Sequence, residues 1–375
     1  MKNKTKVLVA MSGGVDSSIA ALLMKQKKYD VIGAFMKNWS DTKNKITGEC
    51  AWKEERRIAI KIASQLNIPF ITLDFENKYK KDVVDKMFQN YKKGITPNPD
   101  IDCNNKVKFP LLIKAAKKLK CDYVVTGHYA RIQKNKQNQY ELLRAKDESK
   151  DQSYFLYRLS QKDLKYSMFP IGEYTKKQIR ELAKKHKFPN YNKKSTVGIC
   201  FIGKINLKEF LQKKIKPKKG KILDPDKKLI GQHDGIYYYT IGQRIGPRFG
   251  IEIQKPLGQN VKKWYVAKKN PKTNIIIAAP EGHKLNLRQN IIINKFHLID
   301  INKNQFLQKT QKPIRVYSRI RQVGELIPSK LQYNNKLKKY TIQLNKPITG
   351  ISQGQAIVLY QKDKTIGGGE IEFKD

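Results

Sequence analysis

A glycine turn near the N-terminus carries the residue types that bind phosphate. The turn Ser12–Ser18 reads SGGVDSS and directly follows the apolar run Val7–Ala10. Gly13 and Gly14 lack β-carbons, so backbone N–H groups can approach an anion, and the positive end of a helix beginning near Asp16 points to the same place. Serine hydroxyls add donors. The pattern predicts a nucleotide-phosphate site, and a plain turn capped by Asp16 or Ser17 is the alternative.

The turn differs from the Walker loop. No Gly-Lys-Ser/Thr closes it, and no lysine lies inside it to reach a terminal phosphate. The turn is similar to the pyrophosphate loop of ATPases that cleave ATP between its α- and β-phosphates. This similarity predicts AMP and pyrophosphate as products.

Two cysteines lie in segments rich in proline or glycine. Cys103 lies in the segment 94–104, in which Pro97 and Pro99 predict a stiff, irregular loop that no helix can cross. Asp100 lies three residues before Cys103, where a carboxylate could move protons for a thiol nucleophile. Cys200 stands between two glycines. The common alternative, a small buried residue, is kept for Cys50 and Cys121.

The first two hundred residues alternate between strands and helices. Apolar runs predict strands at 7–10, 31–36, 70–73 and 122–126, and helical spacing predicts helices after residue 16 and at 52–66, 79–91 and 111–119. This alternation predicts an α/β domain with a doubly wound parallel sheet whose site lies at the strand ends. The turn, Met36 and Gly127 all lie at such ends.

The helical period is lost from about residue 206. Short apolar runs separated by turn residues predict strands at 264–267, 275–278, 291–293, 314–321, 340–344 and 356–360. We therefore expect three domains: an ATP-binding catalytic domain (1–205), a small β-rich central domain (206–282) and a C-terminal β-barrel (283–375).

Composition narrows the range of partners. Lys+Arg 77 against Asp+Glu 32 gives a formal charge of +45, which favours nucleic acid, although AT-rich codons could supply part of the lysine. The four cysteines form no Cys-x-x-Cys pair, which disfavours a zinc site, an iron–sulfur cluster or a disulfide framework. Without a signal peptide or transmembrane run, a cytoplasmic protein without a membrane partner is expected.

Several longer motifs together resemble one family, the tRNA-specific 2-thiouridylases of the MnmA type. The motifs fall in the family's order and cover nearly the whole chain: 12–18, 96–100 with Cys103, 126–131, 150–156, 198–203, 239–244 and 367–369. The resemblance implies that the enzyme uses ATP to replace the C2 oxygen of the wobble uridine of tRNA with sulfur.

The resemblance also implies residue roles. Cys103 would be the nucleophile and Cys200 the carrier of a persulfide, supplied by a cysteine desulfurase or a sulfur-relay protein. ATP, with Mg²⁺ as companion of its phosphates, would contact Ala10, Met11, Ser12, Gly13, Gly14, Val15, Asp16, Ser17, Met36 and Gly127. The target base would face Asn98, Pro99 and Asp100, and other parts of the tRNA would contact Lys150, Asp151, Gln152, Arg319 and Ile320.

The sequence departs from the family pattern at two places, and two other functions remain as alternatives. Ser195-Thr196-Val197 precedes Gly198 where the family has an aspartate, and Ile245-Gly246-Pro247-Arg248 replaces a glycine-rich turn. The rivals are another pyrophosphate-loop enzyme, which modifies tRNA or forms amides, and a non-catalytic RNA-binding protein. Serine substitutions at Cys103 and Cys200 would leave the function of the latter intact.

Overall fold

A sheet of five parallel strands carries the glycine turn. The computed structural model describes residues 4–41, 49–194, 202, 206–246, 262–300, 312–322 and 324–373. The strands lie in the order β3-β2-β1-β4-β7, with bounds β1 (Lys6–Ala10), β2 (Asp30–Lys37), β3 (Phe70–Asp74), β4 (Tyr123–Val125) and β7 (Ser167–Met168). The predicted parallel sheet is confirmed, with β1 at its centre.

Helices cover both faces of this sheet. Val7 and Val9 of β1 pack in one cluster with α1 (Val15–Gln26), α2 (Ala51–Gln65) and α9 (Lys176–Lys185). Leu8, between them, packs in another cluster with α6 (Phe109–Lys118) and α8 (Gln161–Lys165). A strand buried on both faces explains why the run 7–10 is apolar throughout.

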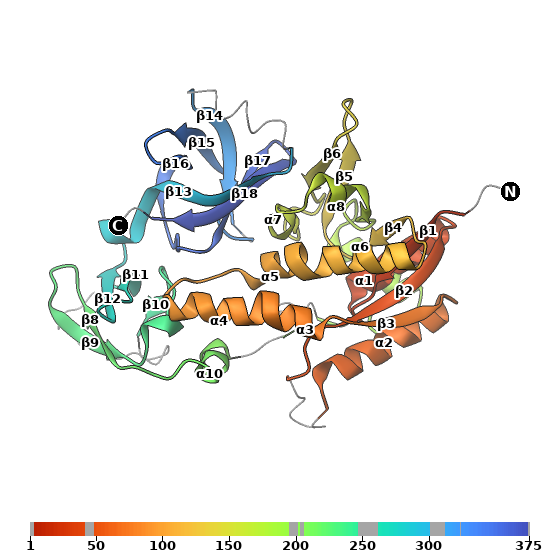
Figure 1. Ribbon diagram of the computed structural model, residues 1–375, viewed down its shortest axis with the longest axis horizontal. Coiled ribbons are helices and arrows are strands. Elements are labelled where there is room, and N and C mark those ends of the chain that lie inside the picture. Colours follow the sequence, from red (N-terminus) through yellow and green to blue (C-terminus); the bar gives the residue numbers. More distant parts are fainter. Residues whose placement is uncertain are drawn as a thin grey trace.

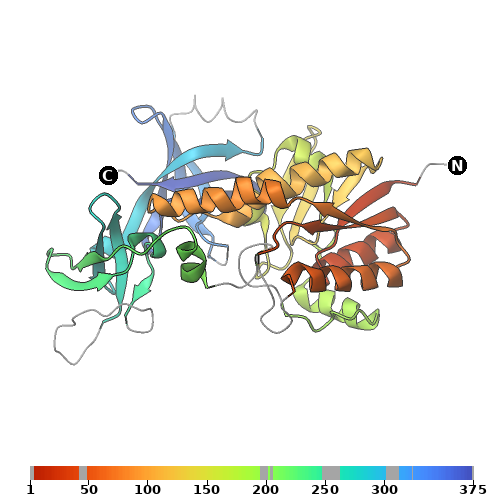
Figure 2. The same cartoon turned by 60° about the horizontal axis from the view of Figure 1, so that its bottom comes forward.

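Two long helical stretches run side by side across the middle of the molecule (Figures 1 and 2). The first consists of α3 (Glu76–Tyr79), the π-helical η1 (Lys80–Val84) and α4 (Asp85–Lys92). The second consists of α5 (Pro99–Asp102), the π-helical η2 (Cys103–Lys108) and α6. The prediction of a non-helical loop through Cys103 is therefore wrong. Pro99 is the first residue of a helix, a position where the missing N–H costs nothing.

A closed barrel of six strands occupies the C-terminal part. Its strands are β13 (Leu287–Leu298), β14 (Ile314–Arg319), β15 (Ile327–Asn334), β16 (Lys339–Thr349), β17 (Ala356–Gln361) and β18 (Lys364–Glu372), and pairing of β13 with β18 closes it. The predicted barrel is confirmed. The apolar runs had not indicated β15 or β18.

The barrel sheet continues into the N-terminal half of the chain. The hairpin β5 (Ala130–Lys134) and β6 (Tyr140–Arg144) projects from the part of the molecule that holds the parallel sheet and stands beside the barrel (Figure 1). Thr365 of β18 pairs with Leu142 of β6, and Lys364 pairs with Leu143. One ladder of hydrogen bonds thus joins the first part of the chain to the last.

A smaller sheet lies between these parts in sequence. Its order is β10-β11-β12-β8-β9, with bounds β8 (Gly220–Leu223), β9 (Leu229–His233), β10 (Arg244–Ile245), β11 (Trp264–Asn270) and β12 (Ile275–Pro280). The short helices α7 (Ser153–Leu156), α10 (Leu207–Gln212), η3 (Ile236–Tyr238) and η5 (Lys284–Asn286) complete the described elements.

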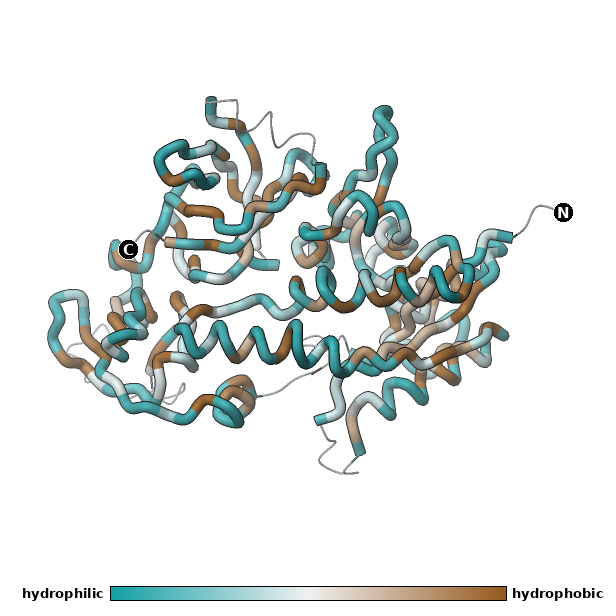
Figure 3. The backbone as a smooth tube through the Cα atoms, viewed as in Figure 1, coloured by the Kyte–Doolittle hydropathy of each residue, from teal (hydrophilic) through white to brown (hydrophobic). Residues whose placement is uncertain are grey.

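Apolar residues concentrate along the strands and inner helix faces, and hydrophilic residues dominate the loops and outer helix faces (Figure 3). No helix among the described residues is long and apolar enough to span a membrane.

Candidate active site

The glycine turn is built by close backbone approaches. Gly13 has a φ of +74°, and a β-carbon there would lie 2.4 Å from the carbonyl oxygen of Glu55. Gly14 caps α1. The hydroxyls of Ser17 and Ser18 donate to the carbonyl of Gly14 at 3.0 and 2.9 Å. These two serines therefore brace the turn in this structure, and the N–H groups at the start of α1 are the donors that could face an anion.

Gly127 lies against the same helix start. A β-carbon at Gly127 would be 2.7 Å from Asp16 C and from Ser17 N, so only glycine permits this approach. The neighbouring His128 is buried, its ring stacks on Phe109, and burial lowers its pKa well below the usual value. The His128 imidazole is therefore neutral, and its packing holds the segment after β4 beside the glycine turn.

The other residues predicted to contact ATP line the adjoining strand ends. Met11 N donates to the carbonyl of Ala34 at 2.8 Å, which continues the β1–β2 pairing up to the turn. Met36 lies two residues further along β2 and is buried against the sheet. The structure thus brings together the turn, Ala10, Met11 and Gly127 and places Met36 on the neighbouring strand, while their contacts with ATP stay a prediction.

Asp16 faces two donors from other elements. Lys176 Nζ lies 2.6 Å from Asp16 Oδ1, and Tyr129 Oη donates to the same oxygen at 2.9 Å. The Lys176 ammonium also lies 5.8 Å from the centre of the Tyr129 ring. Burial and the Asp16 carboxylate raise the pKa of Tyr129, so its hydroxyl stays protonated as a donor. A lysine therefore stands at the turn although the turn contains none.

Sequence reasoning missed Lys176. It is the first residue of α9, after Thr175, whose side chain forms a capping box with Gln178. The box signals a helix start. Nothing local marks this lysine among the chain's 77 lysines and arginines, because its partner Asp16 lies 160 positions away.

The predicted nucleophile begins a π-helical turn. The Asn98 side chain caps α5 by accepting from Ile101 N at 3.4 Å, and Asp100 and Cys103 follow on the helix. Cys103 is completely buried, in a hydrophobic cluster that also contains Trp39, Tyr79 and Ile202. π-Helical turns are frequent at functional sites. In this structure Cys103 must become accessible before it can react.

Cys200 and Gly198 lie outside the described residues, as do Ser195–Val197, Pro247 and Arg248. Ile202, two positions beyond Cys200, belongs to the buried cluster of Cys103. The predicted roles of nucleophile and persulfide carrier require Cys103 and Cys200 to come into contact, and that contact is a prediction. Cys121 is buried, in keeping with a small core residue, whereas Cys50 is only partly buried.

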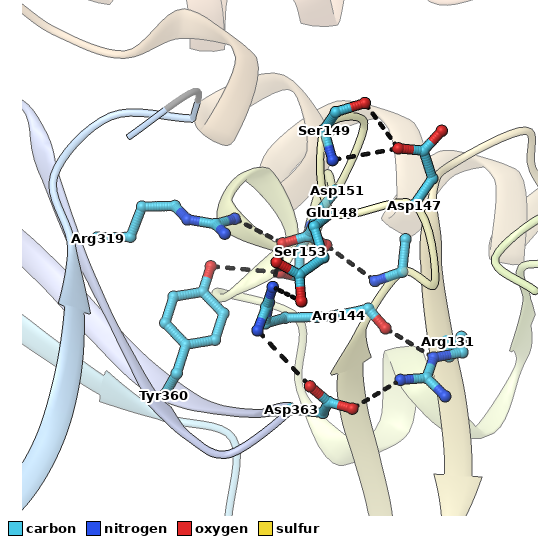
Figure 4. A network of polar contacts seen from close by, with 11 residues as sticks. Arg131, Arg144, Asp147, Glu148, Ser149, Asp151, Ser153, Arg319, Tyr360 and Asp363 are labelled. Carbon is cyan, nitrogen blue, oxygen red and sulfur yellow. Dashed lines mark hydrogen bonds and ion pairs between the residues drawn. The ribbon is translucent and has the colours of Figure 1, made fainter. Parts of the chain in front are cut away.

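Three of the five residues predicted to contact other parts of the tRNA, namely Asp151, Arg319 and Ile320, are buried at the junction of hairpin and barrel (Figure 4). Arg319 Nη1 lies 2.5 Å from Asp151 Oδ2, and their side chains are 5% and 0% exposed. Asp151 also accepts from Ser153 N and from Ala145 N, both at 3.1 Å. This ion pair joins the barrel to the segment after β6, which gives both residues a structural role.

The neighbours of this pair differ in exposure. Lys150 is exposed, Gln152 is partly exposed and accepts from Tyr129 N, and Ile320 is buried. The prediction that these residues contact tRNA stays open for all of them. Only Lys150 and Gln152 present side-chain surface for such a contact in this structure. Among the described residues, no group of three or more His, Cys, Asp and Glu side chains could hold a metal ion.

Three family models match the chain one after another. They are described as the tRNA methyl transferase HUP domain (residues 5–204), the tRNA methyl transferase PRC-barrel domain (208–280) and the aminomethyltransferase beta-barrel domain (288–371). The three descriptions agree with the sheet, the small central sheet and the barrel.

Curated relatives match over nearly the whole chain. The tRNA-specific 2-thiouridylase MnmA of Pediococcus pentosaceus is 38% identical over 371 residues, covering 99% of this chain and 96% of the relative. The protein of the same name from Bacillus cytotoxicus is 39% identical over 374 residues, with the same coverage. Among solved structures, a 4-thiouridine synthetase–RNA complex with bound ATP has a TM-score of 0.36 and 15% identity, covering 56% of this chain and 50% of that one.

Proposed function

The chain belongs to the tRNA-specific 2-thiouridylase family, and from that premise we propose how its residues perform the reaction. The enzyme uses ATP to thiolate C2 of the wobble uridine of tRNA, giving 2-thiouridine, AMP and pyrophosphate. The observation that carries the nucleotide part is the meeting of Gly13, Gly14 and Gly127 at the start of α1.

We propose that ATP binds at this glycine turn with its phosphates toward the N-terminus of α1. Close backbone approach and unpaired N–H groups suit an anion. Ala10–Ser17, Met36 and Gly127 would line the site. Mg²⁺ would arrive with the ATP phosphates, and we assign no protein ligands to it.

Sulfur transfer is assigned to Cys103, Cys200 and Asp100. The uridine C2 oxygen attacks the α-phosphorus of ATP, and pyrophosphate leaves. Sulfur then reaches C2 from a persulfide on Cys200, and the oxygen departs with AMP. Cys103 attacks the Cys200 sulfur, either to free sulfide from the persulfide or to release the thiolated base. Both routes leave a Cys103–Cys200 disulfide that a reductant must reopen, and Asp100 would move the protons.

The remaining assignments complete the proposal. The tRNA would contact Asn98–Asp100 through the target base and Lys150–Gln152 and Arg319–Ile320 through other parts. A cysteine desulfurase or a sulfur-relay protein would supply the persulfide. We propose domains at 1–205, 206–282 and 283–375, and a cytoplasmic location. The charge of +45 suits a polyanionic substrate.

The direct test is a product assay. We expect mass spectrometry of anticodon nucleosides to show 2-thiouridine after the enzyme is incubated with tRNA, ATP and a persulfide source. Labelled ATP should give AMP and pyrophosphate in the same reaction. ADP as the main product would contradict adenylation, and a non-catalytic RNA-binding protein would give neither product.

Lys176→Ala should weaken ATP binding. The ammonium, 14% exposed, lies beside the turn, and its loss leaves the Asp16 carboxylate to repel phosphate. A charged hydrogen bond contributes about 1.5–3 kcal/mol, so the Kd for ATP should rise roughly tenfold to a hundredfold. Equilibrium binding of ATP measures the effect.

The matched control is Lys177→Ala, which removes an exposed lysine one position along α9. Its Kd for ATP should equal that of the unmodified enzyme, and Lys176→Arg should restore part of the affinity. Equal affinities for all variants would show that Lys176 only holds Asp16 in place.

A further inference from the structure

The segment before the nucleophile is held by parts of the chain far from it in sequence. Residues 94–98 leave the end of α4 and enter α5. Thr96 and Pro97 are buried, and Thr96 N donates to the carbonyl of Gln353 at 3.3 Å. This segment, which we call the base loop, therefore depends on contacts from the barrel.

Gln355 makes the most specific of these contacts. Its side-chain Nε2 donates to the carbonyls of Thr96 and of Pro97, at 2.9 Å each. One amide thus fixes two successive peptide planes. The turn that carries Gln355 is itself tied to β18, because Ile371 N donates to the Gln355 carbonyl at 2.8 Å.

The turn fits closely against the base loop. Gly354 has a φ of +84°, and a β-carbon there would lie 2.2 Å from Ile95 Cγ2. The connection between η3 and β10 adds a contact from another part of the chain, since the hydroxyls of Thr96 and Thr240 lie 3.1 Å apart. Thr240 N in turn donates to the side chain of Gln243 at 3.0 Å. Three parts of the chain therefore meet at Thr96.

Proline makes the segment that follows stiff. Pro97 and Pro99 have fixed φ angles, and each restricts the residue before it to extended conformations. Asn98 then caps the helix that carries Asp100 and Cys103. With few free dihedral angles between Thr96 and this helix, the orientation set at Thr96 and Pro97 is passed on to Cys103.

We propose that Gln355 is a positioning residue of the thiolation site. By holding the carbonyls of Thr96 and Pro97, it sets the placement of Asn98, Asp100 and Cys103. The barrel is then part of the active site as well as a part that could contact tRNA. The inference rests on the proposed function in one respect, because its kinetic measurement requires that the enzyme make 2-thiouridine.

The test is Gln355→Glu, which keeps the shape of the side chain. The ionised carboxylate has no hydrogen-bond donor, so both hydrogen bonds are lost. Its oxygens also repel the carbonyl oxygens of Thr96 and Pro97. A small misplacement of reacting groups can cost about a hundredfold in rate, so we expect kcat for 2-thiouridine formation to fall roughly tenfold to a hundredfold. Affinities for ATP and tRNA should stay unchanged. The buried Cys103 should be alkylated faster by iodoacetamide, measured by peptide mass spectrometry.

Two further variants separate positioning from general damage. Gln353→Glu introduces the same charge two residues away, where only the backbone carbonyl contacts Thr96, and it should behave like the unmodified enzyme. Gln355→Lys restores donors within reach of both carbonyls and should recover most of the activity. Cys121, buried in a different hydrophobic cluster from Cys103, reports unfolding if it becomes reactive as well.

The outcomes decide between the alternatives. Unchanged kcat and Cys103 alkylation in Gln355→Glu would overturn the proposal, and so would equal effects of Gln353→Glu. If Gln355→Glu does not fold, Gln355→Lys provides the test. A folded Gln355→Lys enzyme with a low kcat and fast alkylation of Cys103 would then overturn the proposal. An unmodified enzyme that makes no 2-thiouridine refutes the proposed function, whereas Cys103 alkylation still tests the contact.

Discussion

Cys103→Ser and Cys200→Ser are each expected to abolish 2-thiouridine formation, lowering its rate on the order of a thousandfold or more. A serine hydroxyl can neither carry a persulfide nor attack sulfur at neutral pH as a thiolate does. Affinity for tRNA should be unchanged, because neither substitution alters charge or size appreciably. Nucleoside mass spectrometry and equilibrium binding to tRNA measure the two quantities.

The two variants should differ in one respect. Of the two, only Cys200→Ser should fail to accept labelled sulfur from a persulfide donor, and neither variant should form the Cys103–Cys200 disulfide of the unmodified enzyme. That bond needs α-carbons about 4.4–6.8 Å apart. Cys50→Ser and Cys121→Ser are the matched controls and should keep activity. A Cys200→Ser enzyme that still makes 2-thiouridine from the donor would contradict the persulfide mechanism.

Arg319→Ala should destabilise the protein strongly. The substitution leaves the buried Asp151 carboxylate with Arg144 Nε, 4.0 Å away, as its remaining arginine partner. Breaking a buried pair costs about 3–5 kcal/mol, and because Arg144 stays in place we expect a loss at the lower end of that range. Urea unfolding followed by fluorescence measures the loss. Arg315→Ala, on the same strand but exposed, is the control and should change stability little.

A double variant isolates the ion pair from other effects. Arg319→Met with Asp151→Asn removes both charges and should recover part of the stability lost in Arg319→Ala. If Arg319→Ala alone unfolds at the same urea concentration as the unmodified protein, the ion pair does not join barrel and hairpin. Weaker tRNA binding by Arg319→Ala is informative only in a variant shown to be folded.

Local patterns were sufficient for the parallel sheet and the glycine turn. A strand buried on both faces must be apolar throughout, and Gly13 and Gly127 are required by approaches of 2.4 and 2.7 Å. The prediction at Pro99 was wrong because a proline has two readings. It is excluded from a helix interior, but it is favoured at the first position of a helix. The helix cap formed by Asn98 distinguishes these two positions. Its hydrogen-bond partner, Ile101 N, belongs to the helix that had to be predicted.

Contacts across long separations could not be predicted. Lys176 and Asp16 lie 160 positions apart, and Gln355 and Thr96 lie 259 apart. The side chains of Lys176 and Gln355 resemble many others in the chain. Their roles arise from the packing of three parts, which a single sequence does not display.

The ladder between β6 and β18 has a consequence for experiments on fragments. Strand β6 has β18 as its partner on the side away from β5. A fragment that ends before the barrel would leave the backbone donors and acceptors of β6 exposed, and such bare strands recruit other chains. Catalytic-domain fragments of this enzyme should therefore aggregate on expression, and substitutions are the better way to dissect it.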